Sequence, residues 1–251
     1  MVVSAALCFA LMGVSARSTK KSLPKQETPV IQVRNYTKAF EIVSTEAVGE
    51  TYVVTLRNAS EKAISAYTWS LGPGNRPTYS EDTDAAISGQ FINAGAIYKV
   101  QIPLIAFLHS AETTPSHQSI LNFVAVLFDD QSGEGFPQRI AILKDRRIGE
   151  RLQLKRIKQL LTAAAADSES LSRLNNLKAS ISALPETAGD GKSDAVNEGL
   201  LSAKRHTLVL LDHLTTEHGG INKLSGPDRD VHARRILNNL IEQASTWLAR
   251  Y

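Results

Sequence analysis

The tripeptide Gly191-Lys192-Ser193 matches the end of a phosphate-binding loop and raises the question of nucleotide hydrolysis. Such a loop needs an earlier glycine, at the position that Glu186 occupies here, and a buried strand leading into it. A carboxylate at position 186 would repel a phosphate, and the apolar spacing before it is helical. We therefore predict an ordinary loop between two helices, with no nucleotide as a partner.

A second group of candidate ligands is the acidic segment that contains Asp129, Asp130 and Glu134. Carboxylate oxygens of this kind can bind calcium. The spacing does not fit a helix-loop-helix calcium site, because the position that should supply the last glutamate is Ile140. A solvated hairpin turn is the favoured interpretation, since glycine and aspartate suit tight turns.

Histidines and carboxylates also gather between His206 and His218, with Asp212 among them. On a helix, His206, His213 and Glu217 would share one face, but the His-Glu-x-x-His pattern of a zinc site is absent. An exposed pair of His213 and Glu217 is the favoured interpretation. The Gly-x-Ser-x-Gly pattern of esterases is absent too, and a Ser-His-Asp triad from distant positions stays open. We expect no cofactor, no metal and no identifiable catalytic residue.

The most informative charged segment runs from Arg146 to Lys158. If it is helical, four of its basic residues form one stripe beside an apolar face, and such a stripe could bind an anionic lipid surface, an acidic polymer or nucleic acid. The alternative is a solvated helix face, because Glu150 interrupts the charge and no aromatic residue is interleaved for base stacking. The candidate surface for an anionic partner consists of Arg147, Arg151, Lys155 and Lys158.

The composition is that of an ordinary soluble globular protein. Of the 251 residues, 43% are hydrophobic and 21% are charged, which argues against disorder and against a membrane-embedded body. The formal net charge of +3 is too small to identify a partner by itself.

Residues 1–16 have the pattern of a secretory signal peptide. They form an uncharged, mostly apolar run that ends in Val14-Ser15-Ala16 and is too short to span a bilayer as a helix. Cys8, the one cysteine, lies in this run, so the mature chain would contain no disulfide, thiol nucleophile or cysteine-ligated zinc. We expect a secreted or periplasmic protein, with no transmembrane span in the mature chain.

The rest of the chain divides into a linker and two regions of different period. Residues 17–32 are polar and contain two prolines, as in a flexible linker. In residues 33–145 apolar residues alternate, which predicts an antiparallel β-sandwich of about seven strands. In residues 146–251 the apolar period becomes helical, which predicts an antiparallel bundle of about four helices. The expected fold class is therefore α+β.

Details of the first region can also be predicted. Tyr52, Val54 and Leu56 should lie on one face of a strand. The next strand should place Ala63, Ser65, Tyr67, Trp69 and Leu71 on one face, and the two strands should form a hairpin or a sheet-to-sheet corner. The apolar run from Phe123 to Phe128 is the expected central strand, and "QRIAILKD" should follow its turn as a further strand.

Three segments of this region are "YVVTLRNASEKAISAYTWSL", "INAGAIYKVQIPL" and "NFVAVLFDDQSGEG". They resemble the Asn-x-Ser corner, glycine-initiated strand and acidic turn of exported bacterial immunoglobulin-like sandwich domains, over roughly residues 38–145. The resemblance implies a domain that binds or spaces, and it implies no catalytic residue.

We therefore expect an exported, non-catalytic binding or scaffolding protein of the cell envelope. Its partner would be an unidentified protein or an anionic envelope surface, and export argues against nucleic acid. The alternative is an envelope hydrolase whose active site no motif reveals. A pocket with converging titratable groups would favour the hydrolase, and an exposed apolar patch or sheet edge would favour binding.

Overall fold

The structure is a computed structural model of the chain. It describes residues 31–73, 79–84, 91–104, 106, 119–166, 170–189, 191–216 and 227–251. The expected signal peptide, residues 1–16, and the expected linker up to residue 30 lie outside the described residues.

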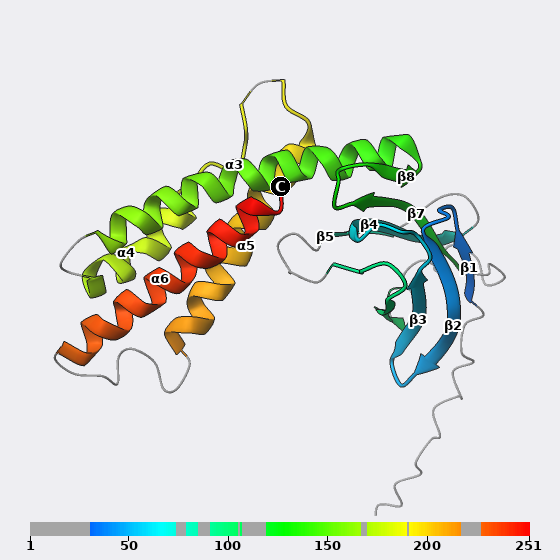
Figure 1. Cartoon of the computed structure of the whole chain (residues 1–251), viewed down its shortest axis with the longest axis horizontal. Coiled ribbons are helices and arrows are strands. Elements are labelled where there is room, and N and C mark those ends of the chain that lie inside the picture. The colour runs from blue at the N-terminus through cyan, green and yellow to red at the C-terminus, as the bar shows by residue number, and fades with distance from the viewer. Residues whose placement is uncertain are drawn as a thin grey trace, which may run out of the picture.

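The fold is mixed α+β. The described part of the chain contains eight strands in two sheets and four helices, with the strands on one side and most of the helical residues on the other (Figure 1). In chain order the elements are β1 (Ile31–Asn35), β2 (Phe40–Val48), β3 (Thr51–Asn58), β4 (Ile64–Pro73), β5 (Tyr79–Asp84), β6 (Ile97–Pro103), β7 (Ser119–Phe128), β8 (Gly133–Gly135), α3 (Pro137–Ala165), α4 (Ser170–Ser182), α5 (Asp194–Thr216) and α6 (Pro227–Ala249).

One sheet has the strand order β1-β7-β4-β5, with β8 also paired to β7, and the other has the order β2-β3-β6. The pairing of β1 with β7 is parallel, with Ile31 opposite Ser119, whereas the remaining pairs are antiparallel. This parallel pair corrects the expectation of a wholly antiparallel arrangement. Side chains alternate in the same way in both kinds of sheet, so the apolar pattern carried no information about strand direction.

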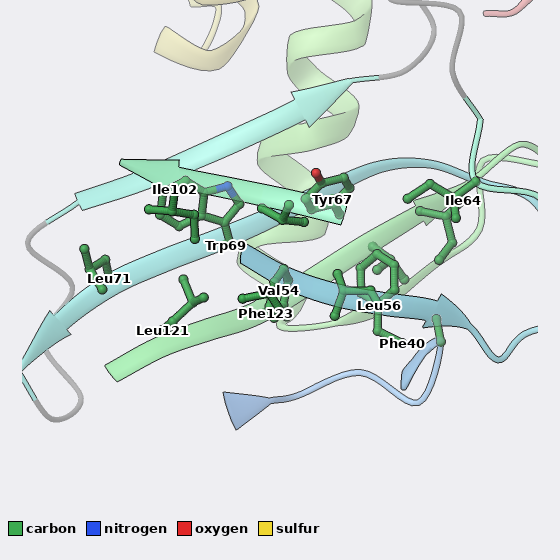
Figure 2. Packing of buried hydrophobic residues seen from close by; sticks show 14 of the residues in the cluster. Phe40, Val54, Leu56, Ile64, Tyr67, Trp69, Leu71, Ile102, Leu121 and Phe123 are labelled. Carbon is green, nitrogen blue, oxygen red and sulfur yellow. The ribbon is translucent and has the colours of Figure 1, made fainter. Parts of the chain in front are cut away.

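Apolar side chains from both sheets share one hydrophobic core. The expected face of β3, formed by Tyr52, Val54 and Leu56, is part of this core, as are Tyr67 and Trp69 of β4 (Figure 2). Because β3 and β4 belong to different sheets, the segment between them is a corner rather than a hairpin, which settles the alternative that the sequence left open.

The start of β4 departs from the predicted face. The register to β7 shifts between Ile64 and Ala66, so Ser65 is an extra residue in a β-bulge, and its hydroxyl donates a hydrogen bond of 2.9 Å to the Leu127 carbonyl. Ile64 therefore enters the core in place of Ala63 and Ser65. A bulge reverses the alternation of side chains, and this cannot be read from a regular period of two.

Strand β7 is the central strand that its apolar sequence predicted. All of its 10 residues are buried, with β4 on one side and β1 and β8 on the other. The start of α3 covers the outer face of this sheet, where Leu143 and Ile140 pack against Ala66, Ala125 and Leu127.

The helical region begins earlier than expected. Residues 138–145, predicted as a strand, are the first turns of α3, which runs without interruption from Pro137 to Ala165 through the boundary expected near Asp145. Proline near the N-terminus of a helix is a start signal, and Ile140, Leu143 and Arg147 follow at helical spacing.

The second half of α3 packs against α4, α5 and α6. Ile157 and Leu161 of α3 share a hydrophobic core with Leu177 of α4, Leu211 of α5 and Leu237 of α6. Among the helices of the described residues, none combines the length and the apolar character that crossing a membrane requires.

Candidate functional site

Arg147, the first residue of the predicted basic stripe, is buried rather than exposed. Only 4% of its surface is accessible, and its guanidinium binds the Asp84 carboxylate of β5 through two contacts, Nε to Oδ2 at 2.9 Å and Nη2 to Oδ1 at 3.3 Å. Nη1 also donates to Gln131 Oε1 at 3.2 Å. The buried Asp84 carboxylate, itself only 3% exposed, explains why this arginine turns inward.

One turn further along α3, Glu150 is completely buried. Its Oε2 accepts a hydrogen bond of 2.7 Å from the Tyr251 hydroxyl, and its Oε1 lies 3.5 Å from Nε of Arg146. Neither Oε1 nor that Nε forms a hydrogen bond with any described residue. A buried carboxylate with one oxygen so poorly satisfied is costly to keep charged.

The surroundings of Glu150 shift its proton affinity. Burial, and after it the nearby Asp84 carboxylate, raises the pKa of Glu150 to about 7, although the hydrogen bond from Tyr251 and the charge of Arg146 act in the opposite direction. Burial also raises the pKa of the Tyr251 phenol well above its ordinary value, so the hydroxyl keeps its proton and remains a donor.

We call this group the junction cluster, and it consists of Asp84, Arg146, Arg147, Glu150 and Tyr251. It joins β5, α3 and Tyr251, which lies two positions beyond the end of α6, and the Arg147 guanidinium lies 6.0 Å from the centre of the Tyr251 ring. The cluster contains no serine, cysteine or histidine nucleophile, so its chemistry is that of a buried ionic clamp.

Sequence reasoning missed every member of the junction cluster except Arg147, which it placed on the surface. A signal was present, because Arg147 and Glu150 occupy positions in the spacing of three and four residues that Leu143, Leu154 and Ile157 continue. Charged residues at core positions of an amphipathic helix indicate buried partners. Asp84 and Tyr251, distant in sequence, carry no such signal.

The other stripe residues stay on the surface. Arg151 and Lys155 are exposed and Lys158 is half-buried. Lys155 and Lys158 border a shallow groove of about 670 Å³ between α3 and Leu248 of α6. The structure therefore separates the predicted stripe into one buried arginine and three cations at the surface.

A second groove, of about 710 Å³, lies between β5 and the starts of α3 and α5. Ser193 donates a hydrogen bond of 2.7 Å to Asp145 Oδ2 there, and Arg146 donates one of 3.2 Å to the Asp82 carbonyl. The lining residues are Ser80, Glu81, Asp82, Arg139, Ala141, Ile142, Asp145, Arg146, Ser193, Asp194, Ala195 and Glu198. They include several carboxylates, with Asp145 directly beside Ser193, but no histidine, lysine or cysteine.

The remaining motifs have structural roles. Gly191, Lys192 and Ser193 lie in the loop between α4 and α5, which confirms the predicted helix-to-helix loop. The acidic segment after β7 is confirmed as a turn leading into β8, where Asp130 accepts hydrogen bonds from Lys62 Nζ at 2.6 Å and from the Ser132 amide at 2.9 Å. The hydrogen bond from Lys62, first among several, lowers the pKa of Asp130.

The histidine-carboxylate group is dispersed. His206 packs edge-on against Trp247 with ring centres 5.1 Å apart, and partial burial lowers the pKa of His206. Asp212 pairs with Lys178 at 2.8 Å, whereas Glu217 and His218 lie outside the described residues. No group of three or more His, Cys, Asp or Glu residues in the described part of the chain is arranged to hold a metal ion.

Comparison of the chain with protein-family models, with curated proteins and with solved structures finds no match in any of the three.

Proposed function

We propose that this chain is an exported, non-catalytic binding or scaffolding protein of the cell envelope, in which an immunoglobulin-like sandwich is joined rigidly to an antiparallel helical bundle. The hydrophobic core that the two sheets share is an argument for the sandwich. The hydrophobic core that α3, α4, α5 and α6 share is an argument for the bundle.

The observation that carries the proposal is that α3 belongs to both regions. Its first turns place Leu143 on the outer face of the β7 sheet, and its last turns place Ile157 and Leu161 in the core of the helices. A continuous helix of 29 residues is about 43 Å long and resists bending. The junction cluster holds β5 and Tyr251 to its middle (Figure 1), so α3 would serve as a rigid connection between two surfaces.

Neither of the two grooves brings a serine together with a histidine, and this favours a non-catalytic role over the hydrolase alternative. Glu150, which has the pKa best suited to acid-base work, is fully buried and cannot meet a substrate in this conformation. In the groove between β5 and the starts of α3 and α5, the Ser193 hydroxyl is hydrogen-bonded to the Asp145 carboxylate, and the lining contains no histidine.

Rigidity can be tested by distance measurements between two spin labels. A chain that begins at Arg17 contains no cysteine, so Ile97→Cys on β6 and Val231→Cys on α6, 64% and 70% exposed, would be the only label sites. We expect one narrow distance distribution, and a broader one when Arg147→Met is added. A broad distribution in the chain with an intact junction cluster would contradict a rigid scaffold.

Export and the lack of catalysis need separate measurements. Cell fractionation with intact-mass determination should find the native chain in the envelope or outside the cell, shortened at Ala16. An intact chain in the cytoplasm would contradict export.

Hydrolysis of ester, peptide or glycoside substrates that is lost in Ser193→Ala would contradict the non-catalytic role and establish the hydrolase alternative.

A further inference from the structure

The solvent-facing side of α3 has an unusual composition. Its central turns expose Lys144, Ile148, Arg151, Leu152 and Lys155. Arg151 and Leu152 are adjacent, and the other steps between these residues are three or four positions, so the five side chains share one face of the helix. We call these five residues the exposed α3 face. Lys144 joins the cations of the predicted stripe here, and Arg147 does not belong to the face, because it points toward β5.

Every charge on the exposed α3 face is positive. Of the two acidic residues of α3, Glu150 is buried, and the half-buried Asp145, at the edge of the face, accepts a hydrogen bond from Ser193. Lys144, Arg151 and Lys155 form no ion pair with any residue that the structure describes. Their charges are therefore available to an external anion.

The same face exposes two large aliphatic side chains. Ile148 is 47% exposed and Leu152 is 37% exposed, and each lies within one helical turn of two of the three cations. Single exposed aliphatic residues are common on soluble proteins. Aliphatic residues interleaved with lysine and arginine along one helix face are typical of helices that lie in the headgroup layer of a membrane.

We propose that the exposed α3 face docks on a membrane surface that contains anionic lipid. The cations would bind lipid phosphates, and Ile148 and Leu152 would enter the boundary between headgroups and acyl chains. Lys158 and the groove beside Leu248 would extend the contact along the helix. The inference rests on the proposed envelope location and identifies the envelope partner.

An acidic soluble polymer is the competing partner. It would satisfy Lys144, Arg151 and Lys155 equally well, but it offers no apolar layer for Ile148 and Leu152. The composition of the face therefore favours a membrane over an acidic polymer.

The test is cosedimentation of the chain from Arg17 onward with two kinds of vesicle. One kind is phosphatidylcholine alone, and the other is phosphatidylcholine mixed with phosphatidylglycerol. We expect binding only to the anionic vesicles, with a loss at high salt, because surface charges are screened. Changing Lys144, Arg151 and Lys155 together to Gln should lower the partition coefficient on the order of 100-fold at low salt, since each cation near an anionic surface contributes several-fold.

A matched variant controls for net charge. Lys99, Arg205 and Arg234 are exposed cations on β6, α5 and α6, and changing all three to Gln alters the charge by the same amount. This control should bind as the unmodified chain does. Equal losses in the two triple variants would overturn the proposal and indicate non-specific attraction.

Entry of the apolar residues can be followed separately. A polarity-sensitive dye on Ile148→Cys should shift to shorter emission wavelength on anionic vesicles, whereas the same dye on Ile97→Cys of β6 should not. Binding without a shift at position 148 would overturn this docking face. Tight binding to polyglutamate without binding to vesicles would overturn the proposal of a membrane partner and would identify an acidic polymer as the partner.

The outcome is separable from that of the proposed location. If the chain is exported but does not bind vesicles, only the proposal of a membrane partner is contradicted. If the chain binds vesicles but is found in the cytoplasm, only the proposed envelope location is contradicted.

Discussion

Gly149 of α3 and Gly199 of α5 bring the backbones of two helices into direct contact. A Cβ atom on Gly149 would lie 1.9 Å from the Val196 carbonyl oxygen, and one on Gly199 would lie 1.9 Å from the Arg146 carbonyl oxygen. Either distance is far inside van der Waals contact. The crossing therefore requires glycine on both helices, and it lies beside the junction cluster, because Glu150 directly follows Gly149 and Arg146 lies three positions before it.

Gly149→Ala should destabilise the fold, opposite to the usual effect of this substitution in a helix. Alanine normally stabilises a helix interior by roughly 0.5–1 kcal/mol relative to glycine. Here the methyl group would force α3 and α5 apart, and overpacking of this kind costs about 1–3 kcal/mol. Urea unfolding followed by circular dichroism measures the difference. Thr162→Ala, at an exposed site of α3, should change the free energy of unfolding little, and a Gly149→Ala variant as stable as the parent would contradict the close crossing.

Removal of one partner of the Arg147–Asp84 pair should be strongly destabilising. Both side chains are almost fully buried, so Arg147→Met would leave the Asp84 carboxylate without its main counter-charge. Breaking a buried pair in this way typically costs about 3–5 kcal/mol, whereas replacing both partners with apolar residues can be nearly neutral.

A double-mutant cycle in urea separates these cases. Arg147→Met should unfold at much lower urea than the double variant Arg147→Met/Asp84→Leu. Additive effects of the two single changes would show that the contact at 2.9 Å does not couple them.

The buried Asn58 should contribute more to stability than an exposed turn asparagine. Its Nδ2 donates to the carbonyls of Lys62 and Ile92 at 2.8 and 2.7 Å, and its Oδ1 accepts from the Ser60 amide at 3.0 Å. Asn58→Ala would leave buried polar groups unpaired, which costs about 1–3 kcal/mol for each group. Asn93→Ala, at an exposed position of the turn before β6, should cost little in the same urea assay. Equal effects of the two changes would contradict this role.

Local patterns predicted the elements of this fold well. Alternation identified the core face of β3, the apolar run from Phe123 to Phe128 identified β7, and helical spacing identified α4, α5 and α6. These successes share a cause, because burial of one face imposes a period on neighbouring residues. The Asn58-Ala-Ser60 corner was also recognisable, since asparagine hydrogen-bonds its own turn.

The site could not be predicted in the same way. Arg147 looks like a surface cation until Asp84, 63 positions earlier, is placed against it. Tyr251 reaches Glu150 across 101 positions. Contacts of this range leave no local period, so the spacing that places Arg147 and Glu150 among the core positions of α3 does not identify their partners. The two helical glycines were the one local clue to the crossing.

The stability of the protein should fall as the pH rises from about 4.5 to about 7, through the ionisation of Glu150. The ordinary pKa of this carboxyl is 4.5, and burial raises it to about 7 in the folded chain. Between these values the folded state binds more protons than the unfolded state, so the free energy of unfolding decreases with pH. At about 1.4 kcal/mol for each tenfold change in proton affinity, the effect reaches at most about 3 kcal/mol.

Glu150→Gln isolates this contribution, because the amide resembles the protonated acid and still accepts the Tyr251 hydrogen bond. We expect the variant to match the parent near pH 4.5 and to be more stable above pH 7 in urea unfolding at a series of pH values. Glu242→Gln, an exposed glutamate of α6, should leave the pH profile unchanged. Tyr251→Phe should extend the decline to higher pH, since the hydrogen bond from Tyr251 lowers the pKa of Glu150. Profiles of Glu150→Gln and the parent that stay parallel from pH 4.5 to 8 would show that Glu150 does not titrate in this window, and that the junction cluster holds it charged.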